Sequence, residues 1–572
     1  MEQMSQAKRA LNRLQRLLIT ESKIIYLILF YAMLNGVIIL TLPLGIQAII
    51  NYIMGGRVST SWVILIIIVM AGLVLSGIIQ IAQMKMTERL QQRIFAKSSF
   101  ELALRIPRIK LGSMQNRYAP EMVNQFFDTV TLQKGLSKLL VDYPTAALQI
   151  IFGLILISIY HPVFVFFSFG VLVLIYLIFK FTGPRGVETS LKESSHKYQV
   201  AHWLEELART MGTFKLAGKT KLPLLRVDKL VMGYLEYRNK HFSILILQYK
   251  TMVAFKVLVV VSLLIIGSLL LIQNEISIGQ FVAAEIIIIL IMNSIEKIIV
   301  GLETVYDTLT SIEKLGALTD LPLEDENTTL PVYPANQFGF GIVVENLRFR
   351  YPSTRDLVIN HLSLRVLAGE KIVLIGTVGS GKSTLMQLLM GFYEDYEGLI
   401  SYNGLSLGTL RLDQLRKDVG DNVWQEHIFQ GSLRENLTMG NSDITDDDVL
   451  EAIAHVGLSD QVTLLPNGLD TQLYPGGIKL PGTVSKKIIL ARSIIGKPRM
   501  LLLDLEVDFL KSDEREKLYN HVLSQPFTMI AATTDSEFMQ RADRIVFMTR
   551  GNIAFEGNYE QFMQSPYAES IR

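Results

Sequence analysis

The chain has 572 residues, of which 50% are hydrophobic and only 19% are charged. This length exceeds one ordinary domain, and so apolar a composition is atypical of a soluble protein. A net charge of +2 argues against nucleic acid as a partner, and the lack of any cysteine excludes disulfides, thiol catalysis and cysteine-bound zinc.

The first part of the chain is dominated by apolar runs. Its first twenty residues form a basic amphipathic stretch without a cleavage-site pattern, so we expect no removable signal peptide. Six runs long enough to cross a bilayer follow, near residues 24–50, 62–82, 143–160, 163–180, 253–273 and 278–300. Only His161 and Pro162 separate the third run from the fourth, and we interpret the two as helices in a tight hairpin. The alternative is a long buried helix pair in a soluble protein.

The segments that connect these runs are asymmetric in length and charge. Arg57 is the only lysine or arginine in the short connections at 51–61, 161–162 and 274–277. Lysine and arginine are abundant in the long, helical segments 83–142 and 181–250. Positive charge marks the cytoplasmic side of a membrane. We therefore expect both termini in the cytoplasm and long cytoplasmic extensions of the membrane helices.

Two ionisable residues fall within the apolar runs. Lys256 lies near the cytoplasmic end of the fifth run, where its amine can reach the membrane surface. Glu285 lies deeper, where a carboxylate is costly unless it faces a translocation path or a partner. Glu285 is therefore a candidate for contact with a transported substrate.

The hydropathy falls after Gly301, and the second part of the chain has a different pattern. The segment LEDENTTLPVYPANQFGF is acidic, polar and proline-bearing, as linkers are. Strand and helix patterns alternate beyond it, which indicates an α/β domain. The predicted organisation is a helical transmembrane domain at 1–320, a linker at 321–340 and an α/β domain at 341–572.

The sequence VLIGTVGSGKST carries a phosphate-binding loop directly after the predicted strand KIVLI. Its glycines allow the backbone to wrap a phosphate, and the following helix presents its positive end to the anion. Lys382 would neutralise the β- and γ-phosphates, and Ser383 would ligate magnesium. The predicted ATP-binding residues of this loop are Gly376, Gly379, Ser380, Gly381, Lys382, Ser383 and Thr384.

A membrane half of six helices fused to such a domain resembles an ABC exporter, and the similarity covers nearly the whole chain. The resemblance implies that ATP and Mg²⁺ are bound. It implies that Tyr351, in FRYP, stacks on adenine, and that Gln425, in DNVWQEHIFQGSLRENL, lies near the γ-phosphate. It also implies that Asp504, which ends the strand MLLLD, holds magnesium together with Ser383 and Gln425.

Other positions depart from the pattern of that family. The family follows the aspartate with a glutamate that polarises the attacking water, but this sequence has Leu505. Loss of a general base costs about 10²–10⁴ in rate. Glu506 is one step further along an extended segment and faces the other way, so we do not expect it to take over. Thr534 stands in place of the switch histidine, so that no catalytic residue is intact.

The signature segment, which caps the γ-phosphate bound by the opposite subunit in this family, is also altered. Pro481 removes both a hydroxyl and an amide donor. Pro475 stands where these exporters often have a glutamate, and Lys511 where they usually have an aspartate. The five residues aligned with the signature are Leu480, Pro481, Gly482, Thr483 and Val484, and only Leu480 and Gly482 match.

We interpret the chain as an ATP-binding exporter subunit that hydrolyses ATP weakly. It would act as a homodimer, or as a heterodimer with a catalytically intact ABC exporter. The segment NQFFDTVTLQKGLSKLL is most similar to type I secretion exporters of proteins and peptides, which predicts a multi-pass protein of the bacterial inner membrane. Such exporters often work with a periplasmic adaptor and an outer-membrane channel.

Two other functions compete with this interpretation. The chain is alternatively a catalytically inactive subunit that regulates or scaffolds a secretion complex. A soluble ABC factor that acts on ribosomes is excluded by the six apolar runs. Cleavage of leader peptides is not expected, because the sequence has no cysteine and the first apolar run begins near Lys23.

Overall fold

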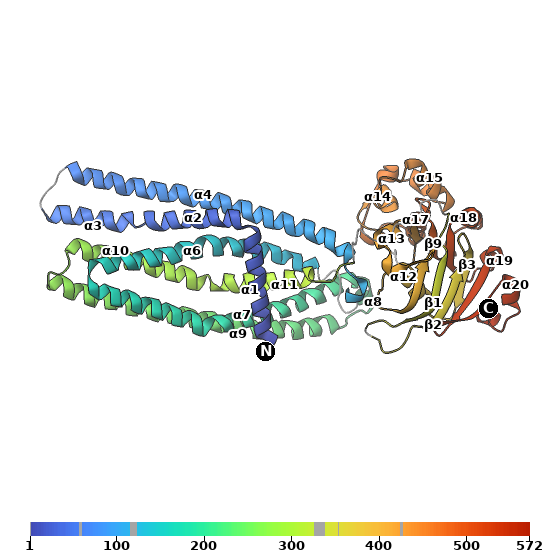
Figure 1. The fold of residues 1–572 in the computed structure, drawn as a ribbon, viewed down its shortest axis with the longest axis horizontal. Coiled ribbons are helices and arrows are strands. Elements are labelled where there is room, and N and C mark those ends of the chain that lie inside the picture. The colour runs from blue at the N-terminus through green and yellow to red at the C-terminus, as the bar shows by residue number, and fades with distance from the viewer. Residues whose placement is uncertain are drawn as a thin grey trace. The chain divides into compact units, whose positions relative to one another are not determined.

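The computed structural model describes residues 2–55, 60–114, 123–324, 338–352, 354–423 and 427–571. The chain divides into two compact units, Met1–Pro107 with Tyr118–Leu321, and Arg108–Arg117 with Pro322–Arg572. The first unit is helical and the second is α/β (Figure 1). The predicted linker falls largely on residues 325–337, which lie outside the described residues.

The first unit is helical; most of its helices are long and run side by side, and α1 lies across them (Figure 1). Their bounds are α1 Glu2–Thr20, α2 Ser22–Ile38, α3 Thr41–Met54, α4 Thr60–Arg105, α6 Asp128–Tyr160, α7 Pro162–Arg209, α8 Met211–Leu216, α9 Leu222–Ile272, α10 Ile278–Val300 and α11 Leu302–Thr319. Short 3₁₀ turns occupy Ile106–Arg108, Leu111–Met114 and Gln125–Phe127.

Among the described residues of this unit, five helical segments are long and apolar enough to cross a membrane, where six were expected. They are Ser22–Met54, Ser61–Arg108, Gln125–Tyr160, Leu222–Ile272 and Ile278–Thr319. The expected fourth run is helical as well, but its apolar part, Pro162–Ile178, is shorter than the others.

Two breaks in these helices have clear local causes. The hairpin expected at His161 and Pro162 is present, because α6 ends at Tyr160 and α7 begins at Pro162. His161 Nδ1 accepts a hydrogen bond from the amide of Val163 at 3.3 Å, and proline is favoured at the first helical position. The break between α2 and α3 was not predicted. Pro43 follows it in the first turn of α3, where a missing N–H is tolerated.

The apolar helices leave much of their surface uncovered within the described chain. Only 11% of the most apolar stretch of α4 is buried, and 28% of that of α9. Large patches of exposed apolar side chains do not occur on soluble monomers of ordinary kind. This surface fits a hydrocarbon environment, as expected for a membrane domain.

Some polar side chains of the helical unit form contacts between neighbouring helices. Lys256 on α9 forms an ion pair with Glu296 on α10 at 3.5 Å, a contact that was not predicted. Ser294 donates to Gln149 at 2.7 Å. Glu285 lies half-buried on α10. Lys256 is thus held by a specific partner, and its side chain is 44% exposed.

The second unit contains a parallel sheet edged by one antiparallel strand, and a separate antiparallel sheet (Figure 1). The order in the six-stranded sheet is β12-β11-β3-β10-β9-β6, and in the four-stranded sheet β2-β1-β4-β5. The strands are β1 Ile342–Phe349, β2 Ile359–Val366, β3 Lys371–Gly376, β4 Glu397–Tyr402, β5 Leu405–Ser406, β6 Val419–Asp421, β7 Gly431–Ser432, β8 Gln472–Leu473, β9 Met500–Asp504, β10 Thr528–Ala532, β11 Arg544–Thr549 and β12 Asn552–Gly557. The helices are α12 Lys382–Leu389, α13 Leu412–Lys417, α14 Leu433–Thr438, α15 Asp446–His455, α16 Ser459–Thr463, α17 Gly482–Ile494, α18 Ser512–Ser524, α19 Ser536–Arg541 and α20 Tyr559–Met563.

The segment Arg108–Met114 belongs to the second unit, although it follows a membrane helix in sequence. A β-bridge joins Ile109 to Leu323, and Lys110 forms an ion pair with Glu394 at 2.6 Å. A local sequence pattern could not predict that this segment joins the second unit, because the two residues of the ion pair are 284 positions apart in the chain.

The parallel sheet separates two apolar cores, and strands β3, β9, β10 and β11 contribute to both. On β9, Leu501 and Leu503 enter the core beneath α17 and α18, while Met500 and Leu502 enter the core beneath α12. This alternation follows from the two-residue period of a strand. Strands buried on both faces read as continuous apolar runs, as MLLLD does.

A buried ion pair ties α17 to α18. Lys487 Nζ lies 2.7 Å from Glu514 Oε2, and the two side chains are only 6% and 11% exposed. Lys487 also donates to the carbonyl of Gly457 at 3.0 Å, and Glu514 accepts from the amide of Lys511 at 3.1 Å. The pair therefore links the helix of the signature segment to the helix that follows β9.

Removal of Glu514 alone is expected to destabilise the second unit by about 3–5 kcal/mol, because Lys487 is left buried without a counter-charge. Thermal unfolding of the full chain carrying Glu514→Ala tests this, with Glu516→Ala on the exposed side of α18 as control. The double variant Glu514→Ala with Lys487→Met should recover most of the loss. Equal melting temperatures for the two single variants would contradict the prediction.

Candidate nucleotide-binding site

The loop between β3 and α12 has a backbone that only glycine can supply. An added Cβ at Gly376 would lie 2.2 Å from the carbonyl oxygen of Met548. Gly381 has φ of 100°, and an added Cβ there would lie 3.0 Å from the carbonyl oxygen of Val358. The loop is thus held close to β11 and to the segment before β2, with its amides available to an anion at the start of α12.

Lys382, the first residue of α12, folds over this loop. Its Nζ donates to the carbonyls of Gly376 at 2.8 Å and Thr377 at 3.2 Å, and to Ser380 Oγ at 3.4 Å. Burial lowers the pKa of Lys382, and the nearby charge of Asp504 opposes that shift. The amine is therefore placed to exchange loop carbonyls for phosphate oxygens when a nucleotide enters.

The remaining residues of the loop divide into buried and exposed ones. Ser380 and Thr384 are buried, at 1% and 6% exposure, and support the loop from within. Ser383 and Gly379 are exposed. Ser383 is therefore accessible to a metal ion, as its predicted role requires.

Tyr351 is anchored to the helix that follows the loop. Its hydroxyl lies 2.9 Å from Thr384 Oγ1 and donates to Gln387 Oε1 at 3.2 Å. Its ring contacts Phe349 and Tyr393 edge to face, with centroids 5.1 and 5.4 Å apart. These contacts fix the ring, which remains partly exposed, beside the phosphate-binding loop.

Asp504 ends β9 at the same edge of the sheet and is exposed. Asn422, which sequence reasoning missed, holds its backbone on both sides. Asn422 Oδ1 accepts from the amide of Asp504 at 2.7 Å, and Asn422 Nδ2 donates to its carbonyl at 2.9 Å. The only available signal was the position of Asn422 just after β6, the neighbour of β9.

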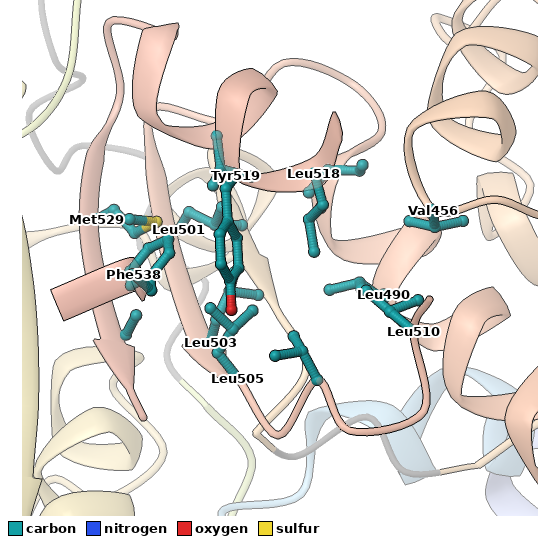
Figure 2. Close-up of a cluster of buried hydrophobic side chains, with 14 of the residues drawn as sticks. Val456, Leu490, Leu501, Leu503, Leu505, Leu510, Leu518, Tyr519, Met529 and Phe538 are labelled. Atoms are coloured by element: carbon teal, nitrogen blue, oxygen red, sulfur yellow. The ribbon is translucent and has the colours of Figure 1, made fainter. Parts of the chain in front are cut away.

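Leu505 belongs to the apolar core and not to the edge of the sheet. It is 3% exposed and continues the ladder, with its amide donating to the carbonyl of Ala532 at 2.8 Å. Figure 2 shows its side chain alongside Leu503 and the ring of Tyr519, in the core beneath α17 and α18. Glu506 is exposed, so the two neighbours occupy different environments. A side chain at position 505 thus points into apolar surroundings.

Thr534 lies just beyond β10 and is exposed. Its neighbour Thr533 donates to the carbonyl of Leu505 at 3.0 Å, and Asp535 caps α19 by accepting from the amide of Phe538 at 2.9 Å. The three residues form a tight turn next to the end of β9. None of the three is basic, so this turn supplies no cation.

The signature residues lie on a different element, at the start of α17. Pro481 occupies the N-cap position without a side-chain hydrogen bond, and its carbonyl accepts from the amides of Val484 and Ser485 at 2.9 and 3.1 Å. Gly482 and Thr483 are exposed, whereas Leu480 and Val484 pack against the apolar core. Serine is a favoured N-cap and proline offers no such acceptor.

Three other predicted positions lie on other segments of the second unit. Pro475 begins a short 3₁₀ turn, and Lys511 precedes α18 as its N-cap. Gln425 lies outside the described residues.

Comparison with known proteins agrees with this architecture. Residues 25–295 match the family described as ABC transporter transmembrane region, and residues 359–505 match the family described as ABC transporter. Both halves of the chain thus belong to the ABC transporters. The chain carries the membrane region and the ATP-binding domain on one polypeptide.

Relatives and a solved structure resemble this chain over different lengths. An export ATP-binding/permease protein of Rickettsia bellii is 25% identical over 365 residues, which are 63% of this chain and 63% of that protein. The ABC transporter ATP-binding protein YwjA of Bacillus subtilis is 28% identical, over 43% of this chain and 47% of its own. This chain thus spans less than two thirds of either relative. The structure of a bacterial Atm1-family ABC exporter with ATP bound has the same fold, with a TM-score of 0.84 and 18% identity over 96% of this chain and 97% of that one.

The residues of the phosphate-binding loop fit a nucleotide phosphate and its metal. The glycine backbone leaves the room that a side chain would fill, and Lys382 supplies the positive charge. Mg²⁺ prefers oxygen ligands, which Ser383 and Asp504 offer on exposed side chains. When bound, Mg²⁺ would neutralise phosphate charge.

Replacement of Leu505 by glutamate is expected to lower stability without restoring turnover, because Thr534 and Pro481 still stand at the switch and signature positions. The change loses about 1.5–3 kcal/mol of apolar burial and adds the cost of burying a carboxylate. The melting temperature of the full chain should fall for Leu505→Glu, while its ATP turnover stays at the wild-type level. Leu505→Met is the matched control and should be nearly neutral. Restored turnover at unchanged stability would contradict the placement of this side chain in the core.

Proposed function

We propose that this exporter subunit binds ATP firmly and hydrolyses it weakly. The single observation that carries the proposal is the pair Asp504 and Leu505 at the end of β9. Asp504 stands at the exposed edge near Lys382, while Leu505 is buried in the apolar core. Binding residues are retained, and no carboxylate follows Asp504 to orient water.

The other altered positions support the same proposal. The exposed Thr534 cannot provide the cation that the family's switch histidine provides. Pro481 weakens the cap that α17 would offer to the nucleotide of a second subunit, because it has neither a hydroxyl nor an amide hydrogen. ATP would thus act by holding two domains together and not by rapid turnover.

Transport is proposed through six membrane helices. The short apolar stretch Pro162–Ile178, fourth in chain order, is included to make six, since it is the first part of the long helix α7. The charge asymmetry of the connecting segments supports both termini in the cytoplasm and a location in the bacterial inner membrane. ATP binding would close the nucleotide-binding domains and turn the membrane half outward. Glu285, half-buried on α10, is the residue proposed to face the substrate.

A protein or peptide is the proposed cargo, with export of the type I secretion kind. This rests on the resemblance of residues 124–140, the start of α6, to such exporters. A periplasmic adaptor and an outer-membrane channel would complete the path.

The working unit is proposed to be a dimer in the bilayer, as is typical of exporters of this fold. A heterodimer is favoured because an intact partner would supply the glutamate and histidine that this chain lacks. A subunit that regulates or scaffolds a secretion complex is the second candidate, and the combined changes at Leu505, Thr534 and Pro481 favour it. Stoichiometric co-purification with a second exporter chain would support the heterodimer, and its absence would support the homodimer or the regulatory subunit.

ATP with Mg²⁺ is expected to stabilise the purified chain by about 2.7 kcal/mol at a hundred times its dissociation constant. Thermal unfolding in lipid nanodiscs measures this shift. Lys382→Ala should abolish it. Tyr351→Ala should weaken ATP binding by about 1–3 kcal/mol through lost stacking on the base, and Tyr351→Phe should retain that stacking. Equal stabilisation of the wild type and Lys382→Ala would contradict nucleotide binding at this loop.

A further inference from the structure

Two helices of the ATP-binding domain bring three metal-ligating side chains together, away from the phosphate-binding loop in sequence. Glu451 and His455 lie four residues apart on α15, and His521 lies on α18. One ligand atom from each lies within 4.8 Å of the others. His455 Nε2 and Glu451 Oε1 are 3.6 Å apart.

The two imidazoles face one another. The rings of His455 and His521 stack with centroids 3.8 Å apart and an angle of 27° between their planes. The two rings come from different helices, α15 and α18, and meet at one place, as ligands of a shared ion must.

The helices that carry these side chains are held in place by apolar packing and by a buried ion pair. Val449 and Ile453 of α15 and Leu518 and Val522 of α18 are buried in the same apolar core. The buried ion pair of Lys487 with Glu514 and the bond from Lys487 to the carbonyl of Gly457 hold the end of α15 near α18. Small side-chain rotations would thus complete the site without moving the backbone.

An opening next to the cluster gives access to it. A cavity of about 370 Å³ is lined by Glu451, His455 and His521 together with Asp448 and Lys497. Lys497 is paired with Asp448 at 3.2 Å. The cavity has room for water to complete a coordination sphere and for an ion to enter.

Two imidazoles and one carboxylate suit a particular class of metal. Zn²⁺ binds histidine nitrogen at about 2.0–2.1 Å and carboxylate oxygen at about 2.0–2.2 Å, and three protein ligands leave a fourth position for water. Mg²⁺ prefers oxygen ligands, so the ion that accompanies ATP is a poor match. Residues four apart on a helix share one face, which is why Glu451 and His455 can act together.

We propose that Glu451, His455 and His521 form a binding site for a divalent transition metal of the zinc class. The ion would staple α15, which lies between β6 and β9 in the chain, to α18, which follows β9. The helical segment before the signature helix would then be tied to the element that follows Asp504. This site is separate from the Mg²⁺ of the nucleotide and does not depend on the proposed function.

Isothermal titration of the full chain with ZnCl₂ tests the site, in lipid nanodiscs, without nucleotide and after removal of any histidine-containing tag. One ion should bind per chain. Glu451→Gln, His455→Gln and His521→Gln should each weaken the affinity by about tenfold or more, since even outer-shell changes cost about 10–100-fold. Co²⁺ in place of Zn²⁺ should give a visible absorption band that His521→Gln removes.

Matched controls separate this site from other histidines of the chain. His361→Gln on β2 and Glu516→Gln on the exposed side of α18 should leave the affinity unchanged. Glu451 is exposed, so Glu451→Gln is tolerated by the fold even if a histidine variant is not. No binding of Zn²⁺ by the wild type would overturn the proposal, as would equal affinity in Glu451→Gln and the wild type.

Discussion

The alternation of side chains along β9 is the constraint on which the nucleotide site depends. Leu501, Leu503 and Leu505 enter one core, so the side chains between them face the side of α12 and the phosphate-binding loop. Asp504 thereby comes near Lys382, and the clamp from Asn422 fixes its backbone there. The same alternation directs position 505 into the apolar core. Leu505 packs in that core and has no carboxylate to present to a nucleotide.

On our proposal, this division lets an ATP-binding domain keep its phosphate-binding residues while its hydrolytic residues change. The affinity for phosphate comes from the glycine backbone, the lysine and the helix start, which lie between β3 and α12. Activation of water would come from residues after β9 and β10, where Leu505 and Thr534 stand. Because the two sets lie on different strands, the second can change while the first still folds and binds. An ATP molecule that is bound but not cleaved keeps the negative charge of its γ-phosphate, and would continue to attract the positive groups of both nucleotide-binding domains that contact it.

Features of the structure that depend on a short stretch of sequence could be predicted. The phosphate-binding loop and the hairpin at His161 and Pro162 depend on short patterns, and both are present. Contacts between residues distant in sequence could not be predicted, because a local pattern does not show which distant residue the fold brings close. The ion pair of Lys256 with Glu296 and the hydrogen bonds between Asp504 and Asn422 are of this kind. The membership of Arg108–Met114 in the second unit is of the same kind. The roles predicted for Tyr351, Gln425, Glu285 and the signature residues remain predictions, and Gln425 lies outside the described residues.

The most direct test of the account is the chemical state of the nucleotide that the chain holds. The purified chain in lipid nanodiscs is incubated with Mg²⁺ and labelled ATP, separated from free nucleotide, and the bound label is resolved into ATP and ADP. The account predicts that the label remains ATP, with turnover no higher than that of Lys382→Ala. Steady accumulation of ADP that Lys382→Ala abolishes would contradict it, and would make the exposed Glu506 the first candidate for a displaced base.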